Sequence, residues 1–213
     1  MRLYDFYILN QRRSIIKNAH YFPIYERHFS KFVGHDVVMF EIGTGRGGSA
    51  LMWKNYFGPQ ARIVTVDIVD NSEFTENQIY PRRGSQADPE FLLSLVQEFG
   101  RPDIVLDDGS HMMDHIKISF ETLFPHTESV YLVEDLDGAY WEDRNGGLGH
   151  PNSFIEIAKQ YVDKMNRLYV RDVGFDHSGG DGITSISFYP MIVALEKARY
   201  ENRLMARMPP GTE

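Results

Sequence analysis

Two pairs of acidic residues follow apolar segments that are typical of buried parallel strands. Asp107 and Asp108 end one such segment, and Glu134 and Asp135 end the next. If these strands are neighbours, Asp108, Glu134 and Asp135 converge at the carboxyl edge of the sheet, where open α/β proteins bind ligands. Three nearby carboxylates repel one another unless a cation joins them. The pattern therefore predicts a site for a hard divalent cation, Mg²⁺ first and Mn²⁺ as an alternative.

His111 stands three residues after Asp108 in the same predicted loop. An imidazole titrates near neutral pH and could take the proton from a hydroxyl held at the metal. His111 is therefore the candidate general base. The alternative is a purely structural role, in which His111 caps a helix and the four acidic residues are helix caps or form surface ion pairs.

A glycine-rich segment between a predicted strand and a predicted helix indicates a nucleotide site. Gly43, Gly45 and Gly48 match the dinucleotide pattern G-x-G-x-x-G, whereas Gly43, Gly45 and Gly47 match the G-x-G-x-G of class I methyltransferases. Glu41, two residues earlier, suits the ammonium of a methionine moiety better than a pyrophosphate. The segment favours S-adenosylmethionine and leaves a dinucleotide or a plain tight turn open.

Two further segments extend the predicted nucleotide site. Asp67 ends the second predicted strand, where a carboxylate can hold both ribose hydroxyls of either nucleotide class. Ser85 or Gln86 could bond the edge of an adenine. The same segment is also a good helix N-terminus before Pro89, and Asp67 could be a turn residue.

Strand-like and helix-like segments alternate along the chain, which is typical of a mostly parallel sheet covered by helices. Strands are predicted over 37–42, 62–67, 79–83, 103–107, 129–134, 168–175 and 184–195, and helices over 15–32, 49–57, 89–99, 115–123 and 154–166. Because no helix separates the last two strands, we expect them to form an antiparallel hairpin at the sheet edge.

Composition restricts the classes of protein that fit. The 213 residues suit one α/β domain, and 42% hydrophobic residues predict a packed core. A net charge of −8 argues against nucleic-acid binding, and no apolar run is long enough to span a bilayer. The lack of cysteine is typical of a cytoplasmic protein. We expect a helical lead-in over 1–34, the main domain over 35–207 and a frayed tail over 208–213.

Three motifs together resemble the metal-dependent sugar O-methyltransferases of natural-product pathways. They cover 106–111, 120–125 and 131–136, and the similarity runs from about Tyr21 to Lys197. The demethylmacrocin, mycinamicin and novobiocin noviose enzymes are of this type. Cephalosporin hydroxylase-like proteins share much of the pattern, so it implies the metal and cofactor sites more firmly than methyl transfer.

The resemblance implies a Rossmann-like class I methyltransferase fold, with a mostly parallel seven-stranded sheet and a C-terminal antiparallel hairpin. It implies Asp108, Glu134 and Asp135 as metal ligands and His111 as general base. Cofactor contacts are implied for Tyr21, Glu41, Gly43, Gly45, Gly47, Ser49, Asp67, Ser85, Gln86 and Asp108. The family's usual Thr-Asp-Lys run before Tyr21 is missing.

The implied function is S-adenosylmethionine- and Mg²⁺-dependent methyl transfer to a hydroxyl of a deoxysugar or glycosylated natural product, as in antibiotic biosynthesis. The glycine-rich loop 138–152 is expected to shape the acceptor pocket. Three alternatives remain open: an NAD(P)-dependent oxidoreductase, a non-catalytic adenosylmethionine-binding or accessory protein, and a methyltransferase for aromatic diols. The sequence does not specify the acceptor, and it leaves a homo-oligomer open.

Overall fold

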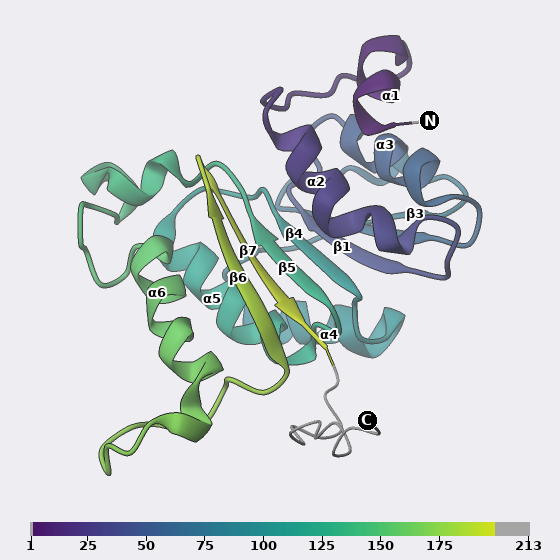
Figure 1. Ribbon diagram of the computed structural model, residues 1–213. Coiled ribbons are helices and arrows are strands. Elements are labelled where there is room, and N and C mark those ends of the chain that lie inside the picture. The colour runs from purple at the N-terminus through teal and green to yellow at the C-terminus, as the bar shows by residue number, and fades with distance from the viewer. Residues whose placement is uncertain (1, 199–213) are drawn as a thin grey trace, which may run out of the picture.

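The computed structural model describes residues 2–198, and within them it forms a seven-stranded sheet of order β3-β2-β1-β4-β5-β7-β6 (Figure 1). The strands are β1 (Val38–Ile42), β2 (Arg62–Asp67), β3 (Ile79–Arg83), β4 (Ile104–Asp107), β5 (Val130–Val133), β6 (Ile183–Tyr189) and β7 (Ile192–Lys197). Strands β1 to β5 are parallel, and β7 pairs antiparallel with both β5 and β6. The predicted Rossmann-like sheet with a terminal hairpin is confirmed.

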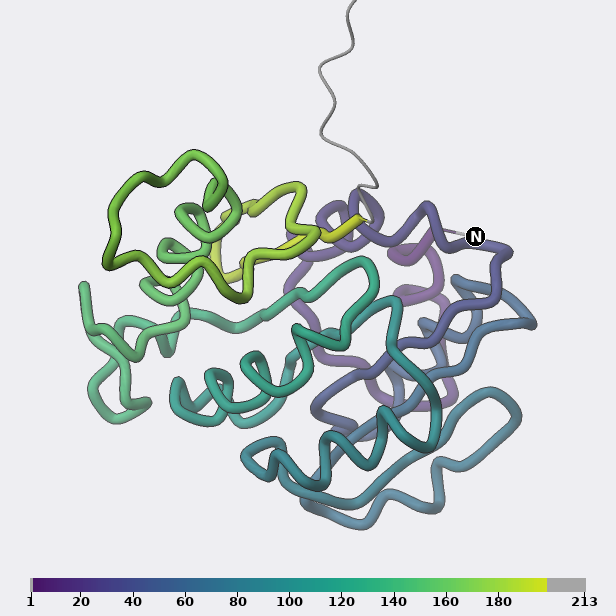
Figure 2. The backbone as a smooth tube through the Cα atoms, turned by 90° about the horizontal axis from the view of Figure 1, so that it is seen from below, coloured from purple at the N-terminus to yellow at the C-terminus, as the bar shows by residue number. Residues whose placement is uncertain are grey.

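Helices cover both faces of this sheet. They are α1 (Leu3–Leu9), α2 (Tyr21–Phe29), α3 (Gly48–Phe57), α4 (Pro89–Phe99), α5 (Met113–Leu123) and α6 (Phe154–Met165). Short 3₁₀ turns are η1 (Ser30–Phe32), η2 (Ser72–Phe74), η3 (Phe124–His126), η4 (Leu136–Tyr140), η5 (Glu142–Arg144) and η6 (Arg167–Tyr169). The N-terminal helices and the loop leading into β6 lie at opposite ends of the molecule (Figure 1 and Figure 2).

The strand β1 shows how the sequence divides the core into two layers. Val38, Phe40 and Ile42 belong to the apolar cluster that includes α4, α5 and α6, whereas Met39 belongs to the cluster that includes α1, α2 and α3. Successive side chains of a strand point to opposite faces, so a strand that is apolar throughout is buried on both. This two-sided burial fixes β1 in the middle of the sheet and leaves its carboxyl end as the start of the glycine loop.

The bounds of the last two predicted strands are wrong. Residues 168–175 contain η6 and a loop instead of a strand, because their apolar side chains are exposed, Tyr169 at 73% and Val173 completely. The single strand predicted over 184–195 is in fact the whole hairpin. Its turn contains Pro190, which cannot donate a ladder hydrogen bond, and Met191, which has a φ of 63°.

The helix predicted over 15–32 begins only at Tyr21, and α1 was not predicted. Residues 10–20, here called the N-terminal strap, have no regular helix. Its side chains reach neighbouring segments instead: Arg12 and Arg13 pair with Glu76, and Lys17 reaches the loop after β4. The predicted tail over 208–213 lies outside the described residues.

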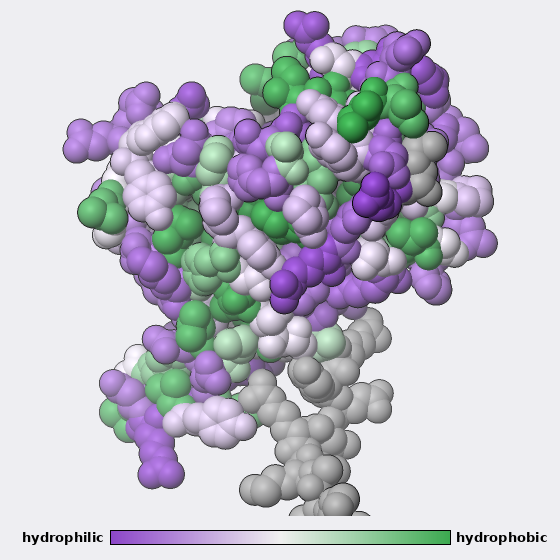
Figure 3. Space-filling model, turned by 45° about the horizontal axis from the view of Figure 1, so that its top comes forward, coloured by the Kyte–Doolittle hydropathy of each residue, from purple (hydrophilic) through white to green (hydrophobic). Residues whose placement is uncertain are grey.

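The described helices are too short or too polar for a membrane span, so residues 2–198 contain no candidate for one. Figure 3 turns the upper end of the molecule, as drawn in Figure 1, toward the viewer. Hydrophilic and hydrophobic side chains are interspersed over this face.

Candidate active site

Gly43 brings the loop after β1 against the loop after β4. Its φ is +97°, and a Cβ atom at this position would lie 2.0 Å from the backbone oxygen of Asp108. The backbone N–H of Asp108 in turn donates to the oxygen of Ile42 at 2.9 Å. Glycine is therefore required for close approach, and the packing sets Asp108 beside the glycine loop.

We expect Gly43→Ala to destabilise the protein more than Gly58→Ala. Both glycines have a positive φ, but the space around Gly58 is open within 4 Å. Gly58→Ala should cost about 1–3 kcal/mol for backbone strain alone, and Gly43→Ala about 1–3 kcal/mol more for the backbone clash. Urea unfolding of the two variants measures this difference, and equal free energies of unfolding would contradict the close approach.

A pocket of about 240 Å³ lies at the carboxyl ends of β1 and β2 and includes Gly43, Asp67 and Ser85 in its lining. Asp67 holds the glycine loop in place, because its Oδ2 atom accepts hydrogen bonds from the backbone N–H groups of Thr44 at 3.2 Å and Gly45 at 3.3 Å. The structure therefore places Asp67 and Ser85 in one pocket with the glycine loop, as a nucleoside site requires.

Gln86 lines the same pocket but has a second role that the sequence did not reveal. Its buried side-chain amide donates to the Asp107 carboxylate at 2.8 Å and 3.1 Å, and its Oε1 atom accepts from the backbone N–H of Ser110 at 2.8 Å. Through these hydrogen bonds Gln86 holds the loop after β4 in place. The predicted N-cap of α4 is provided by Asp88, whose side chain accepts from Glu90 and Phe91.

Glu41 is a buried carboxylate with one unpaired oxygen. Trp53 Nε1 donates to its Oε1 atom at 2.9 Å, whereas Oε2 has no hydrogen-bond partner within the described structure. Burial raises the pKa of Glu41 to about 7, although Lys17, Trp53 and Ser49 oppose the rise. A buried, unpaired carboxylate oxygen is costly, so the position fits a cationic ligand group.

The raised pKa of Glu41 predicts a pH-dependent stability in the absence of ligand. The folded protein binds this proton more tightly than the unfolded chain, so the stabilisation is complete below about pH 4.5 and is lost as the pH rises through about 7. Glu41→Gln cannot titrate. Its free energy of unfolding, relative to wild type, should therefore gain about 1–3 kcal/mol between pH 5 and pH 8. Urea unfolding at both pH values measures this, and a constant difference would contradict the prediction.

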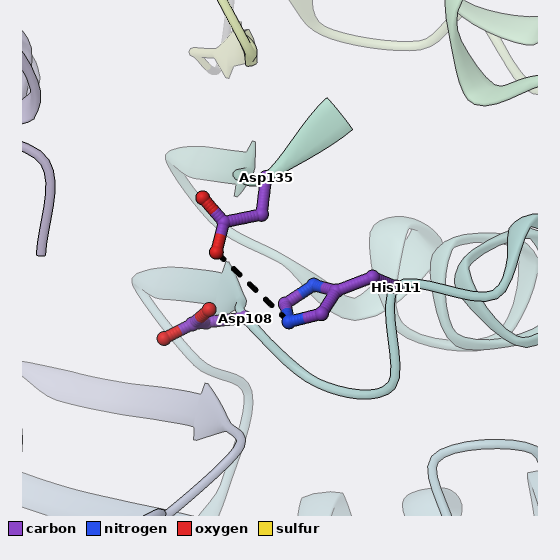
Figure 4. Close-up of side chains that lie close together, drawn as sticks. All are labelled: Asp108, His111 and Asp135. Atoms are coloured by element: carbon purple, nitrogen blue, oxygen red, sulfur yellow. Dashed lines mark ion pairs between the residues drawn. The ribbon is translucent and has the colours of Figure 1, made fainter. Parts of the chain in front are cut away.

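Asp108, His111 and Asp135 form a cluster that could hold a metal ion (Figure 4). One ligand atom from each lies within 4.8 Å of the others, and all three residues are half-buried. His111 Nε2 and Asp135 Oδ2 are 3.9 Å apart. His111 and Asp135 both have left-handed backbones, with φ values of 57° and 56°. Such strain in residues other than glycine concentrates at functional sites.

Glu134 lies beside Asp108 at the edge of this cluster and is joined to it through Lys17. Its side chain is buried, and its two oxygens accept hydrogen bonds from Lys17 Nζ and the Tyr25 hydroxyl. Lys17 Nζ also lies 2.5 Å from Asp108 Oδ2. Burial opposes a charged Lys17, but the charges of Asp108 and Glu134 outweigh burial and raise its pKa. Sequence reasoning missed both Lys17 and Tyr25.

The remaining residues that were predicted to contact the cofactor lie beside the carboxylate cluster or in the glycine loop and the helix that follows it. Tyr21 donates its hydroxyl to Asp135 Oδ1, so it adjoins the carboxylate cluster. Ser49 lies in the first turn of α3, near the Glu41 side chain. Gly45 and Gly47 have φ values of 52° and 69°, which the turn into α3 requires.

A second pocket, of about 280 Å³, adjoins the cluster. His111 and Asp135 line it together with Trp141 and Arg144 from the loop that was predicted to shape an acceptor site. Gly109 and Ser110 line the first pocket. The loop after β4 thus contributes residues to both pockets.

The chain is similar in sequence to known O-methyltransferases. No protein-family model matches the chain. Mycinamicin VI 2''-O-methyltransferase of Micromonospora griseorubida is 41% identical over 199 residues, which are 84% of this chain and 49% of that protein. Demethylmacrocin O-methyltransferase of Streptomyces fradiae is 41% identical over 161 residues, 70% of this chain and 40% of that protein.

A solved structure supports the same relationship. The MycE methyltransferase of the mycinamycin biosynthetic pathway, in complex with Mg, SAH and mycinamycin VI, has a TM-score of 0.81 and 30% identity, covering 92% of this chain and 53% of that one. The chain therefore spans about half the length of the relatives it matches. By sequence and by fold, it is a relative of the natural-product sugar O-methyltransferases.

Proposed function

We propose that this chain carries the catalytic centre of an S-adenosylmethionine-dependent, Mg²⁺-dependent O-methyltransferase that acts on a hydroxyl of a glycosylated natural product. One observation carries the proposal. The loop after β4 carries Gly109 and Ser110 of the nucleoside-type pocket, His111 of the second pocket and Asp108 of the carboxylate cluster. A methyl donor and an acceptor hydroxyl could therefore meet at a metal site.

The first pocket fits the adenosine part of S-adenosylmethionine at two positions. Asp67 is placed to accept hydrogen bonds from ribose hydroxyls, and Ser85 lies in the wall where an adenine would be held. Glu41 does not line this pocket but directly precedes Ile42, which does, and its unpaired oxygen suits an ammonium group. We propose that Gln86 contributes to the adenine site mainly by fixing the loop, since its amide is bonded to Asp107 and Ser110.

The carboxylate cluster fits Mg²⁺, because Asp108 and Asp135 supply hard oxygen donors within reach of one another. When bound, S-adenosylmethionine would supply the methyl group and its leaving group, and Mg²⁺ would lower the pKa of the acceptor hydroxyl. His111 accepts the proton of that hydroxyl at its imidazole, and Tyr21 holds Asp135 in position. The protein therefore has to orient and deprotonate the acceptor.

The relatives favour a sugar acceptor. Their names describe methylation of mycinamicin VI and demethylmacrocin, and the MycE structure contains mycinamycin VI. We propose an acceptor of that class, bound in the pocket beside Trp141 and Arg144. A cytoplasmic location, a homo-oligomeric state and the lack of nucleic-acid or membrane partners remain predictions from the sequence.

Titration calorimetry with S-adenosylhomocysteine and with NAD tests the cofactor. We expect S-adenosylhomocysteine to bind and NAD to bind at least about tenfold more weakly, because Glu41 suits an ammonium and not a pyrophosphate. Tighter binding of NAD would favour the oxidoreductase alternative, which leaves the carboxylate cluster unexplained. Methyl transfer to a macrolide glycoside in a single turnover separates an enzyme from a non-catalytic binding protein, and a catechol acceptor tests the aromatic-diol alternative.

A further inference from the structure

Lys17 is a cation that the protein itself inserts into the carboxylate cluster. Its side chain is 2% exposed, and its ammonium contacts Asp108 Oδ2 and Glu134 Oε1. The residue belongs to no helix or strand, since the N-terminal strap carries it to the edge of the sheet. Burial of an ammonium is costly unless the charge is paired, so these two carboxylates account for its position.

The strap is attached on both sides of Lys17. Before it, Arg12 and Arg13 pair with Glu76, and the backbone oxygen of Ser14 packs so closely on α3 that a Cβ atom at Gly48 would lie 2.2 Å from it. After it, His20 Nε2 lies 3.2 Å from the oxygen of Pro190. The lysine side chain could therefore leave the cluster while the strap remains in place.

Lys17 and a metal ion compete for the same oxygens. Asp108 and Glu134 are two of the three expected metal ligands, and both contact the Lys17 ammonium. The second oxygen of Glu134 accepts from the Tyr25 hydroxyl, so this carboxylate is fully paired within the protein. A divalent ion and an ammonium on the same carboxylate oxygens would repel each other strongly at such short range.

We propose that Lys17 occupies the cation position between Asp108 and Glu134 in the metal-free protein and leaves it when a divalent ion binds there. Lys17 then sets the metal affinity of the site as a competing internal cation. The inference rests on the proposed metal dependence. In the opposing arrangement, Lys17 stays, Glu134 serves only as its structural partner, and the ion is held by Asp108, His111 and Asp135.

The first test measures Mn²⁺ affinity of the whole chain, without cofactor, by the electron paramagnetic resonance signal of free Mn²⁺. Lys17→Met keeps much of the side-chain length and removes the competing charge, so it should bind Mn²⁺ at least about tenfold more tightly than wild type. Lys54→Met is the matched control, because Lys54 also pairs with a glutamate, Glu76, but outside the cluster. Its Mn²⁺ affinity should equal that of wild type.

An unchanged or weaker Mn²⁺ affinity in Lys17→Met would overturn the inference while wild-type binding still supported the proposed metal site. If neither protein binds Mn²⁺, the proposed metal dependence fails and this inference fails with it. Binding of S-adenosylhomocysteine in the same samples reports the cofactor site separately.

A second measurement needs no variant and decides the question if Lys17→Met does not fold. Reductive methylation of wild-type lysines, read by mass spectrometry, should leave Lys17 unmodified without metal, since its side chain is buried. With saturating Mg²⁺, Lys17 should be modified at least about tenfold faster, because opening of a buried site controls such reactions. Equal protection with and without Mg²⁺ would show that Lys17 stays in the cluster and would overturn the inference.

Discussion

His111→Ala is expected to lower kcat by about 10²–10⁴-fold while the affinity for S-adenosylhomocysteine stays nearly unchanged. The imidazole lines the proposed acceptor pocket, and its Nε2 atom lies 3.9 Å from Asp135 Oδ2. A sugar hydroxyl has a pKa far above neutral even when a metal lowers it, so a positioned base remains useful. Steady-state kinetics with a glycoside acceptor, alongside calorimetry with S-adenosylhomocysteine, measures both quantities.

Two further variants separate the base from other roles of this residue. His111→Asn accepts the left-handed backbone at φ 57° better than alanine does, so it should show the same loss of kcat without backbone strain. His35→Ala removes an exposed histidine remote from the site and serves as the control. If His111 acts as a metal ligand instead, excess Mg²⁺ should restore the rate. A folded His111→Asn protein within about threefold of the wild-type kcat would contradict the general-base role.

Asp135→Asn should weaken Mg²⁺ binding and lower kcat/KM by at least about 100-fold, since even partners that only orient metal ligands contribute 10–100-fold. Asparagine keeps the shape of the side chain and tolerates the left-handed backbone that Asp135 adopts at φ 56°. It can also still accept the Tyr21 hydroxyl bond, so the variant removes mainly the charge. Isothermal titration with Mg²⁺ and kinetics at several Mg²⁺ concentrations measure the two effects.

Asp163→Asn, on the exposed side of α6, is the matched control for loss of one surface carboxylate. Chelation of wild type should abolish turnover, and Mg²⁺ or Mn²⁺ should restore it. Full activity of the wild-type protein after chelation would contradict the proposed metal dependence. Full activity of Asp135→Asn at trace Mg²⁺ would contradict it as well.

Local sequence signals were sufficient for much of the fold and for the two pockets. Short apolar runs precede Gly43, Asp108 and Glu134 and predict three buried strands. In the structure these strands are β1, β4 and β5, and the three residues that follow them lie at the carboxyl edge of the sheet. Parallel pairing made that convergence predictable, because neighbouring parallel strands end at the same side of a sheet.

Contacts between distant segments could not be read from the sequence. Lys17 meets Glu134 across 117 positions, and Tyr25 meets it across 109. Nothing in the local pattern distinguishes Lys17 from a surface lysine. Gln86 shows the same limit, because its partners at Asp107 and Ser110 become neighbours only when the sheet has formed.

The hairpin is a different case, in which a local signal was present. Pro190 marks the turn between β6 and β7, and the predicted strand over 184–195 ran through it. Strand β7 is a buried apolar run, whereas β6 is only partly buried. The apolar residues on both sides of Pro190 predicted one continuous strand, although proline has no N–H for the ladder and marks the turn.

A crystal structure of the protein with S-adenosylhomocysteine and Mn²⁺, with anomalous scattering collected at the manganese edge, tests the central claim most directly. We expect an anomalous peak in contact with Asp108 and Asp135, and an adenosine in the pocket lined by Asp67 and Ser85. The sulfur of the cofactor should face the side of the cluster where His111 lies. An adenosine outside that pocket, or a manganese peak away from Asp108 and Asp135, would contradict it.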